Sequence, residues 1–426
     1  MMEGWRTDKF KNQIQHKSGY TWSKDQELKS QEPFSVRVLT VSNIQKELDL
    51  SEELYLQGVS KKDKKEKSVS KDWCIAVSSN GNRKRIGNAV FIRDNTDYLF
   101  ASFLIAFKPK DDSDIIPEYF YRWLSSHEIQ DRITSVSEGT TGLGNLDIRY
   151  LRNMDMYFPG KSEQTAIANI LSKVDEAIAA VQTSIDAAER LKKSLMQNLL
   201  TGRMKPDGTF RTPEEFYTDT KFGKVPLGWE VKKVKDVCLN NGDYGANASA
   251  TIYDGVHPRY IRITDIDESG HLIEDNKVGI LIDKYDNYLL HEDDFLFART
   301  GDSVGKPLLY KKEMGLAVYA GYLIKFTFNK NLILPDYFDL IAKSEFFEAF
   351  KVAMKRVGAK PNINSREYCS FRFLLPIDLE EQLKIYKKLS VLSKQQQEQQ
   401  NKIKALELLK KSLMQNLLTG KIRIKY

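Results

Sequence analysis

Apolar residues recur at alternating steps of three and four along a stretch that begins near position 163. The repeating positions are Ile167, Leu171, Val174, Ile178, Val181 and Ile185, with Leu195 and Leu199 continuing the pattern. This heptad spacing predicts a single helix that carries one narrow apolar seam. Over roughly 38 residues, at about 1.5 Å per residue, the helix would be about 57 Å long.

A second stretch repeats this pattern 218 positions later. The residues LKKSLMQNLLTG stand at both 191–202 and 409–420, and each copy ends in a glycine that can adopt the left-handed conformation closing a helix. In the second copy, two central seam positions are glutamines. The second seam consists of Ile385, Leu389, Leu392, Gln396, Gln399, Ile403 and Leu406.

Seams of this length must be covered by other apolar surface. We expect the two helices to pair as an antiparallel coiled coil, because that arrangement leaves room for one globule at each end. The glutamine pair would then weaken the packing at mid-length and disfavour shifted alignments. The alternative is that each seam packs only on its own neighbouring globule.

The segments outside the two helices also match each other. The residues ASFLIAF at 101–107 align with AGYLIKF at 320–326, and NLDIRYLRNMDMYFP at 145–159 aligns with NINSREYCSFRFLLP at 362–376. Short β-rich runs between glycine turns, together with helical stretches such as 335–349, predict mixed globules. The positions shared by the last pair of segments include Asn145 with Asn362, Arg149 with Arg366, and Pro159 with Pro376.

The predicted fold class is therefore α+β: two mixed α/β globules separated by two long helices, with a pseudo-twofold internal repeat. The expected boundaries are 1–158 for the first globule, 159–203 for the central helix, 204–376 for the second globule, and 377–426 for the distal helix and tail.

Composition narrows the class of protein. A chain of 426 residues with 41% hydrophobic content can bury more than one core. No run of 18 apolar residues is present and the first residues lack an apolar signal core, so we expect no membrane span and a cytoplasmic location. Three widely spaced cysteines fit reduced thiols better than a disulfide framework or a zinc site.

The net charge of +7 is concentrated in one region. Residues 380–426 hold eleven Lys and Arg against four Glu, which accounts for the whole excess. This basic region could lie near a DNA backbone or meet an acidic partner surface, and the sequence does not decide between them. Elsewhere, only local patches of cations can indicate binding to nucleic acid.

Three segments carry a resemblance to a known family. The residues VPLGWEVKKVKDV at 225–237, DDFLFARTGDSVGK at 293–306 and the repeated helix end LKKSLMQNLLTG resemble the specificity subunit of type I restriction–modification enzymes. The resemblance covers nearly the whole chain. In the first globule, SSNGNRKRIGNAV at 78–90 departs from the Arg-Thr/Ser-Gly turn that is usual there.

The resemblance implies a function and a set of partners. Each globule would be a target recognition domain that reads one half of a bipartite, asymmetric site in double-stranded DNA, and the helices would set the spacing. The helices would also dock two methyltransferase subunits, with restriction subunits as a further partner. The chain itself would bind no cofactor and have no catalytic activity, because S-adenosylmethionine, ATP and magnesium would be used by the partner subunits.

The residues agree with a non-catalytic function. An adenine methyltransferase of this kind needs an Asn/Asp-Pro-Pro-aromatic loop, and the chain contains no Pro-Pro dipeptide. Its five histidines lack the spacing of metal ligands. Two alternatives remain, namely a subunit of a modification-only system and a coiled-coil adaptor that binds nucleic acid.

In the first globule, the loop NGNRKR offers the best candidates for DNA contact. Arginine suits guanine edges and phosphates, and asparagine suits adenine. Globules that read different bases should differ where they read, so we favour this divergent loop and expect the shared positions to serve architecture; a solvated charged turn is the alternative. The candidates are Asn80, Asn82, Arg83, Lys84 and Arg85. The basic segment SKKDKKEKS at 60–68 is expected to be a flexible, solvated loop, with contact to DNA phosphates as the alternative.

In the second globule, the candidates lie on three segments: HPRYIRI at 257–263, RTGDSVGK at 299–306 and KRVGAKPNIN at 355–364. They combine cations with small polar side chains near glycine turns. The candidates are Arg259, Arg262, Arg299, Thr300, Lys306, Lys355, Arg356 and Lys360.

Overall fold

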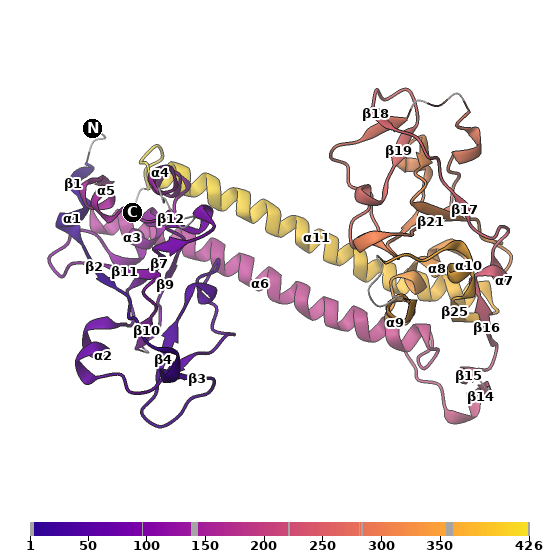
Figure 1. Cartoon of the computed structure of the whole chain (residues 1–426), viewed down its shortest axis with the longest axis horizontal. Coiled ribbons are helices and arrows are strands. Elements are labelled where there is room, and N and C mark those ends of the chain that lie inside the picture. The colour runs from indigo at the N-terminus through magenta and orange to yellow at the C-terminus, as the bar shows by residue number, and fades with distance from the viewer. Residues whose placement is uncertain are drawn as a thin grey trace. The chain divides into compact units, whose positions relative to one another are not determined.

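The protein forms two compact units (Figure 1). Unit 1 comprises Met1–Thr183 and Gln400–Tyr426, and unit 2 comprises Ser184–Gln399. Each unit therefore combines one globule with parts of both long helices. The computed structural model describes residues 4–95, 97–137, 144–219, 222–280, 282, 284–354 and 361–424.

Unit 1 contains short helices around two small sheets and two further strand pairs. The helices are α1 (Phe10–Gln13), α2 (Lys61–Lys67), α3 (Pro117–Leu124), α4 (His127–Val136) and α5 (Ile148–Asn153). The strands are β1 (Arg6–Lys9), β2 (Ile14–Ser18), β3 (Glu27–Leu28), β4 (Val36–Leu39), β5 (Tyr55–Leu56), β6 (Ser68–Val69), β7 (Cys74–Val77), β8 (Ser79–Asn80), β9 (Ala89–Phe91), β10 (Tyr98–Phe100), β11 (Leu104–Pro109), β12 (Gly144–Asn145) and β13 (Asp155–Phe158).

The central sheet of unit 1 has the strand order β2-β11-β7-β9 and is antiparallel throughout. All four residues of β7 are buried, as expected for an inner strand covered on both faces. A second sheet, β3-β5-β4-β10-β6, contains the parallel pair β4 and β10. Strands β1 and β13 form a separate ladder, and β8 pairs with β12.

Unit 2 follows the same plan with a different set of loops. Its shorter helices are α7 (Val234–Val237), α8 (Pro335–Ala342), α9 (Glu345–Met354) and α10 (Ser365–Ser370). Its strands are β14 (Phe216–Asp219), β15 (Gly223–Pro226), β16 (Trp229–Lys233), β17 (Asp243–Tyr244), β18 (Ala250–Ile252), β19 (Arg259–Ile261), β20 (Val278–Ile280), β21 (Phe295–Ala298), β22 (Pro307–Leu309), β23 (Ala317–Tyr319), β24 (Leu323–Phe326) and β25 (Arg372–Pro376).

The sheets of unit 2 correspond to those of unit 1. The sheet β17-β24-β21-β22 has the place of β2-β11-β7-β9, and the ladder of β16 with β25 has the place of β1 with β13. The parallel pair β19 and β23 corresponds to β4 and β10. In the core, the ring of Phe297 stacks on those of Phe347 and Tyr368, at centroid distances of 4.9 and 4.6 Å. The internal repeat read from the sequence is thus a repeat of the fold.

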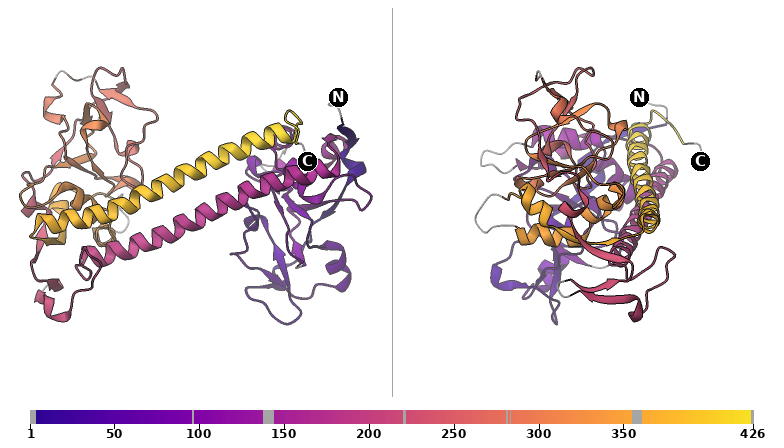
Figure 2. Two further views of the ribbon diagram at one scale, coloured as in Figure 1. Left: turned by 180° about the vertical axis from the view of Figure 1, so that it is seen from behind. Right: turned by 90° about the vertical axis from the view of Figure 1, so that its right-hand side faces the viewer.

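Two long helices, α6 (Lys161–Leu200) and α11 (Leu379–Leu417), have 40 and 39 residues. Both are followed by a glycine with positive φ, +65° at Gly202 and +71° at Gly420, which confirms the predicted helix ends. Within each unit the segments of α6 and α11 run side by side (Figure 2).

The core clusters show that the two helices are antiparallel. In unit 1 the early residues Ile167 and Leu171 of α6 share a core with Leu417, at the end of α11, and with Leu418 just beyond it. In unit 2 the late residues of α6 share a core with the early residues of α11, namely Leu199 and Leu200 with Ile385 and Leu389. The predicted fold class, with its antiparallel coiled coil, is therefore confirmed.

One glutamine anchors the start of each long helix in the same way. Gln164 donates to the carbonyls of Asp114 and Pro159 and accepts from the amide of Ile116, at 2.8–2.9 Å. Gln382 makes the same three bonds, to Leu332, Pro376 and Leu334. Both glutamines have no exposed surface, so these bonds satisfy backbone groups that water does not reach.

One local prediction was wrong. Residues 61–67 form helix α2 rather than a flexible loop. The hydroxyl of Ser60 accepts a hydrogen bond from the amide of Asp63 at 3.0 Å and caps the helix. The acid in the first turn and the three lysines in the last turn complement the helix dipole, so the charges that suggested solvation also favour a helix.

Candidate nucleic-acid interface

The predicted contact loops of the two globules occupy equivalent places. Loop 1 (residues 78–87) connects β7 to β9, and loop 2 (residues 299–305) connects β21 to β22. Each loop is closed by a glycine amide that bonds the last residue of the preceding strand: Gly87 to Val77 at 2.9 Å, and Gly305 to Ala298 at 2.8 Å. The structure therefore presents two different loop sequences from one common frame.

Loop 1 is held in shape largely by its own amide side chains. The side-chain oxygen of Asn80 accepts from the amide of Asn82 at 2.8 Å, and that of Asn82 caps the turn at Lys84 at 3.1 Å. Arg85 donates to the carbonyls of Val41 and Ile44 at 2.9 and 2.7 Å, so its guanidinium ties the loop to a neighbouring turn. The side chains of Arg83 and Lys84 are exposed.

Loop 2 begins with an arginine stacked on an aromatic ring. The guanidinium of Arg299 lies 5.0 Å from the ring centroid of Tyr244, and the Tyr244 hydroxyl accepts from the amide of Ser365 at 3.2 Å. Burial tends to raise the pKa of Tyr244, but the hydrogen bond from Ser365 and the nearby Arg299 and Arg366 lower that pKa overall. Two arginines thus lie near one exposed tyrosine.

The other candidates in unit 2 are paired with acids or carbonyls of the chain. The Nζ of Lys306 lies 2.7 Å from a carboxylate oxygen of Glu268, and its side chain is mostly buried. Thr300 is half-buried, and its backbone is bridged to that of Asn362. These contacts position loop 2 against the body of the unit.

The side chains of Arg259 and Arg262 each form a salt bridge with a nearby carboxylate. Arg259 is only 2% exposed, and its guanidinium bonds a carboxylate oxygen of Glu274 at 3.0 Å and the carbonyl of Ile273 at 2.5 Å. Arg262 bonds Asp265 through two nitrogens, at 2.7 and 3.1 Å. Arg259 lies on a buried strand and has no surface to offer a duplex, so the prediction that it contacts DNA was wrong. Lys355, Arg356 and Lys360 lie outside the described residues.

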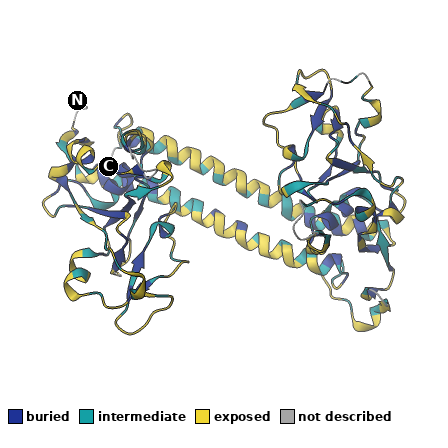
Figure 3. Ribbon diagram, in the orientation of Figure 1, coloured by how far each residue is buried: buried dark blue, intermediate teal, exposed yellow. Residues whose placement is uncertain are grey.

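The seam positions of α6 and α11 are more buried than most of the helix residues between them, and the middle of each helix is largely exposed (Figure 3). Four of the buried seam positions lie near the start of a helix, and Val181 and Ile185 lie near the middle of α6. The buried seam residues are Ile167, Leu171, Val181, Ile185, Ile385 and Leu389; the half-buried ones are Val174, Ile178, Leu392, Gln396, Gln399, Ile403 and Leu406.

In unit 1 an ion network joins both long helices to the globule. Arg122 on α3 is almost fully buried and pairs with Asp175 on α6, whose other oxygen lies 2.6 Å from the Nζ of Lys410 on α11. Burial acts to raise the pKa of Asp175, but the hydrogen bond from Lys410 and the charge of Arg122 hold that pKa below its ordinary value. The network therefore fixes the register of α6 against α11 in this unit.

The same positions in unit 2, counted by the 218-residue repeat, carry Leu340, Ser393 and Lys192. Leu340 is buried and Ser393 has no charge, so the network has no equivalent there. Burial lowers the pKa of Lys192, and the neighbouring Lys343 lowers it further.

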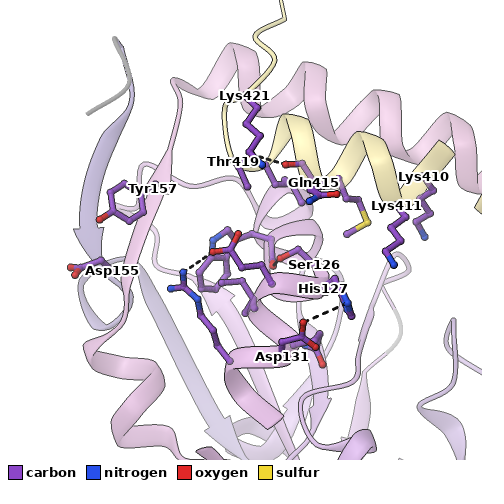
Figure 4. Close-up of a pocket in the computed structure, with 18 of the residues that line it drawn as sticks. Ser126, His127, Asp131, Asp155, Tyr157, Lys410, Lys411, Gln415, Thr419 and Lys421 are labelled. Carbon is purple, nitrogen blue, oxygen red and sulfur yellow. Dashed lines mark hydrogen bonds and ion pairs between the residues drawn. The ribbon is translucent and has the colours of Figure 1, made fainter. Parts of the chain in front are cut away.

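The second helix end also borders a groove of about 1330 Å³ in unit 1, between α4 and α11 (Figure 4). The exposed side chains of Lys411 and Gln415 lie along one side of the groove, and Ser126 and His127 lie along the other. In unit 2 the first helix end borders a smaller hollow of about 640 Å³, which Phe210, Phe216 and Phe222 line. Aromatic residues of the chain border both helix ends: Trp5, Trp123 and Tyr157 in unit 1, and the three phenylalanines in unit 2.

Sequence reasoning missed two features of these surfaces. It did not show that a glutamine at each helix start anchors the fold. It also passed over Phe103 and Tyr322, which occupy the same position in the aligned segments 101–107 and 320–326 and are 53% and 59% exposed. The alignment of the two halves held the signal in both cases.

The described residues also restrict other kinds of site. Across the residues that the structure describes, no group of three or more His, Cys, Asp or Glu side chains is arranged to hold a metal ion. No helix in the described part of the chain is both long enough and apolar enough to cross a bilayer. Cys74, Cys238 and Cys369 are free thiols, and Cys74 and Cys369 are buried.

Comparison with known proteins identifies the family. The model for the type I restriction modification DNA specificity domain matches residues 2–190 and again residues 226–408. The chain therefore belongs to this family and carries two copies of its domain. The family provides the specificity subunit of type I restriction–modification systems, which is a non-catalytic subunit.

Individual relatives agree. The MjaVIII type I restriction enzyme specificity subunit of Methanocaldococcus jannaschii is 25% identical over 295 residues, which span 67% of this chain and 66% of that relative. The type I S subunit from M. genitalium has a TM-score of 0.59 at 15% identity and covers 97% of this chain and 96% of that one. A structure from a study of the assembly and conformational transition of a type I system has a TM-score of 0.55 at 13% identity, and the match covers 99% of each chain.

Proposed function

We propose that this chain selects a bipartite, asymmetric sequence in double-stranded DNA, with each recognition domain (residues 1–158 and 204–376) reading one half. The observation that carries the proposal is that the two domains share a backbone frame but differ in their loop sequences. Loop 1 and loop 2 follow equivalent strands and are closed by equivalent glycines, yet they share almost no side chains. Two domains with the same body and different loops are suited to reading two different half-sites.

Within this proposal, the readout falls to loop 1 and loop 2. Arg83 and Lys84 of loop 1 are exposed cations, and Asn80 and Asn82 shape the turn that carries them. In unit 2, Arg299 and Thr300 stand at the start of loop 2, and Lys306 follows it. Arginine and amide side chains can read base edges in the major groove, whereas lysine suits phosphates.

The helices α6 and α11 would set the spacing between the half-sites and dock two methyltransferase subunits, one on each copy of the repeated helix end. The twin sequences LKKSLMQNLLTG at 191–202 and 409–420 support two copies of one partner. S-adenosylmethionine would then bind to the partners, and ATP and magnesium would be used by restriction subunits where these join. The complex would act on DNA in the cytoplasm.

Mapping methylated adenines tests the proposal directly. The DNA would come from cells that express this chain together with its methyltransferase partner. We expect two short half-sites of different sequence, separated by a fixed spacer. A continuous or palindromic motif would contradict two different readers, and methylation by the purified chain alone would contradict a non-catalytic function.

A domain exchange gives a second test. Replacing residues 1–158 with the recognition domain of another family member should change one half-site and leave the other half-site and the spacer intact. A matched exchange of residues 204–376 should change the opposite half. Changes in both halves after either exchange would contradict independent readers.

A further inference from the structure

Three positions shared by the two repeats carry exposed side chains in both units. They are an aromatic residue (Phe103 and Tyr322), an asparagine (Asn145 and Asn362) and an arginine (Arg149 and Arg366). Phe103 and Tyr322 are more than half exposed, and the four polar residues are also exposed. Packing within a unit does not require an exposed side chain, so architecture does not account for these shared residues, contrary to what the sequence suggested.

In unit 1 the three positions lie around the base of loop 1. The carbonyl of Phe103 accepts from the amides of Ser78 and Ser79 at 2.9 and 3.2 Å, which are the first residues of loop 1. Asn145 on β12 pairs with Ser79 on β8. Arg149 follows within one turn of helix α5, which begins three residues after Asn145.

Unit 2 repeats this arrangement residue by residue. The carbonyl of Tyr322 accepts from the amide of Arg299 at 2.9 Å, at the start of loop 2. Asn362 is bridged to Thr300, and Arg366 lies in the first turn of helix α10. The two sets therefore have the same backbone frame, even though the loops beside them differ.

We propose that these six residues form a shared backbone clamp: in each unit the arginine and asparagine bind phosphate oxygens and the aromatic ring packs on a deoxyribose beside the bases that the loop reads. The proposal rests on the proposed function and assigns it a second set of contacts. Arginine and asparagine bind phosphates without reading sequence, and such contacts set the position of a protein on the duplex.

Repetition is the reason for assigning the clamp to the backbone rather than to bases. If the two units read different half-sites, base-contacting residues should differ between them, as loop 1 and loop 2 do. The sugar-phosphate chain is the same at every site, so residues that touch it can be the same in both units. The clamp and the loops thus divide positioning from readout.

The test uses the full chain and two arginine variants, Arg149→Gln and Arg366→Gln. Binding to a pool of 60-base-pair duplexes of random sequence is followed by fluorescence anisotropy across a salt series. Each variant should bind about fivefold more weakly and reduce the slope of log affinity against log salt by about 1, because one phosphate contact is lost. The double variant should lose about 25-fold.

The control is Arg152→Gln, which removes the same charge from the same helix, α5. Arg152 is exposed, but its counterpart in the repeat is Cys369, so it is not a shared position. We expect less than a twofold change in affinity. Far-UV circular dichroism and the melting temperature check that all variants fold alike.

The aromatic position is tested by exchanging the two native residues. Phe103→Tyr and Tyr322→Phe should bind the duplex pool as the native chain does, whereas Phe103→Ala and Tyr322→Ala should bind about threefold more weakly, since the ring is lost. Equal affinity of the alanine and exchange variants would show that the aromatic ring does not contribute to DNA binding.

Sequencing of the bound duplexes separates the clamp from other assignments. The arginine variants should select the same motif as the native chain; a changed half-site would show base readout and overturn the proposal. Unchanged duplex affinity with weakened binding of the methyltransferase subunit would show a protein-docking surface and also overturn it. If the native chain binds no duplex, alone or with its partner, the proposed function itself fails.

Discussion

The starts of α6 and α11 differ in how each unit holds one glutamate, which is buried in unit 1 (Glu163) and half-buried in unit 2 (Glu381). In unit 1, Glu163 is bound by two nitrogens of Arg423, at 2.8 and 2.7 Å. In unit 2, Glu381 is bound by Arg211 at 2.5 Å and by the indole nitrogen of Trp229 at 3.1 Å. The adjacent glutamines, by contrast, make identical bonds. The amide anchor is therefore part of the repeated fold, whereas each unit neutralises its glutamate with an arginine that stands at a different distance beyond the repeated helix end.

A second difference lies further along the helices. Unit 1 fixes the register of its helix segments with the charged network of Arg122, Asp175 and Lys410, and unit 2 places Leu340 and Ser393 at the corresponding positions. Packing and charge thus serve the same purpose in two copies of one frame. The comparison predicts which substitutions should act alike in both units and which should act in only one.

The largest effect is expected for Gln164→Ala and Gln382→Ala. Each removes a buried amide that satisfies three backbone groups, so the free energy of unfolding should fall by about 4 kcal/mol. Because the bonds are identical, the two variants should agree to within about 1 kcal/mol. Urea denaturation followed by circular dichroism measures the loss, and hydrogen exchange with mass spectrometry shows which unit opens. A large effect in one unit only would refute a shared anchor.

A substitution in the charged network should act in unit 1 alone. Asp175→Asn leaves the buried guanidinium of Arg122 without its closest carboxylate, and the free energy of unfolding should fall by about 2 to 3 kcal/mol. The matched change at the repeat position, Ser393→Asn, should change it by less than 1 kcal/mol. Faster hydrogen exchange confined to α3 and the adjoining part of α6 would locate the effect; equal losses from both variants would contradict the comparison.

The contribution of Asp175 should also depend on pH. Its pKa is lowered in the folded protein from an ordinary value of 3.8, so the carboxylate stabilises the fold fully above that value and loses this effect as the pH falls through the lower folded-state pKa. The difference in stability between the native chain and Asp175→Asn should be constant from about pH 7 to pH 5 and shrink below about pH 4. A difference that grows on acidification would show that the folded-state pKa is raised.

The two helix ends should respond to different degrees. Gly202→Ala introduces a side chain at a positive φ, and its Cβ would lie 2.3 Å from the Cγ of Pro226, so we expect a loss of about 2 kcal/mol. Gly420→Ala meets the same backbone strain, with an expected loss of about 1 kcal/mol. Melting temperatures of the two variants measure the order, and equal shifts would show that the contact with Pro226 relaxes freely.

The smallest effects are expected for substitutions of two tryptophans, Trp229 in unit 2 and Trp5 in unit 1. Trp229→Phe removes the hydrogen bond to Glu381 and should lower the free energy of unfolding by about 1.5 kcal/mol. The indole nitrogen of Trp5 is buried and has no hydrogen-bond partner among the described residues, so Trp5→Phe should change it by less than about 0.5 kcal/mol. Thermal unfolding compares the two, and a larger loss at Trp5 would reverse the comparison.

Patterns that depend on neighbouring residues were predictable from the sequence. The heptad spacing gave both long helices, the Thr-Gly ends gave their termination, and the aligned segments gave the repeat. These features arise from periodicity and backbone conformation, which are local. The antiparallel pairing was favoured over the parallel one because it places one globule at each end of the paired helices.

Features that depend on tertiary contact were not predictable. Arg259 looked like a free cation, but its strand lies inside a sheet and Glu274, 15 residues away, neutralises it. Arg85 looked equivalent to Arg83, yet two carbonyls from residues 41 and 44 capture it. The exposure of Asn145 and Arg149 likewise depends on which face the chain leaves uncovered. A pattern of residue types does not carry that information.

The composition of unit 1 also determines an order of events during synthesis. Its core includes Leu417 and Leu418, and Glu163 is neutralised by Arg423, so unit 1 lacks part of its interior until the last stretch of the chain has left the ribosome. Unit 2 needs only residues 184–399 and can finish earlier. The domain that is translated first is therefore the last to be completed.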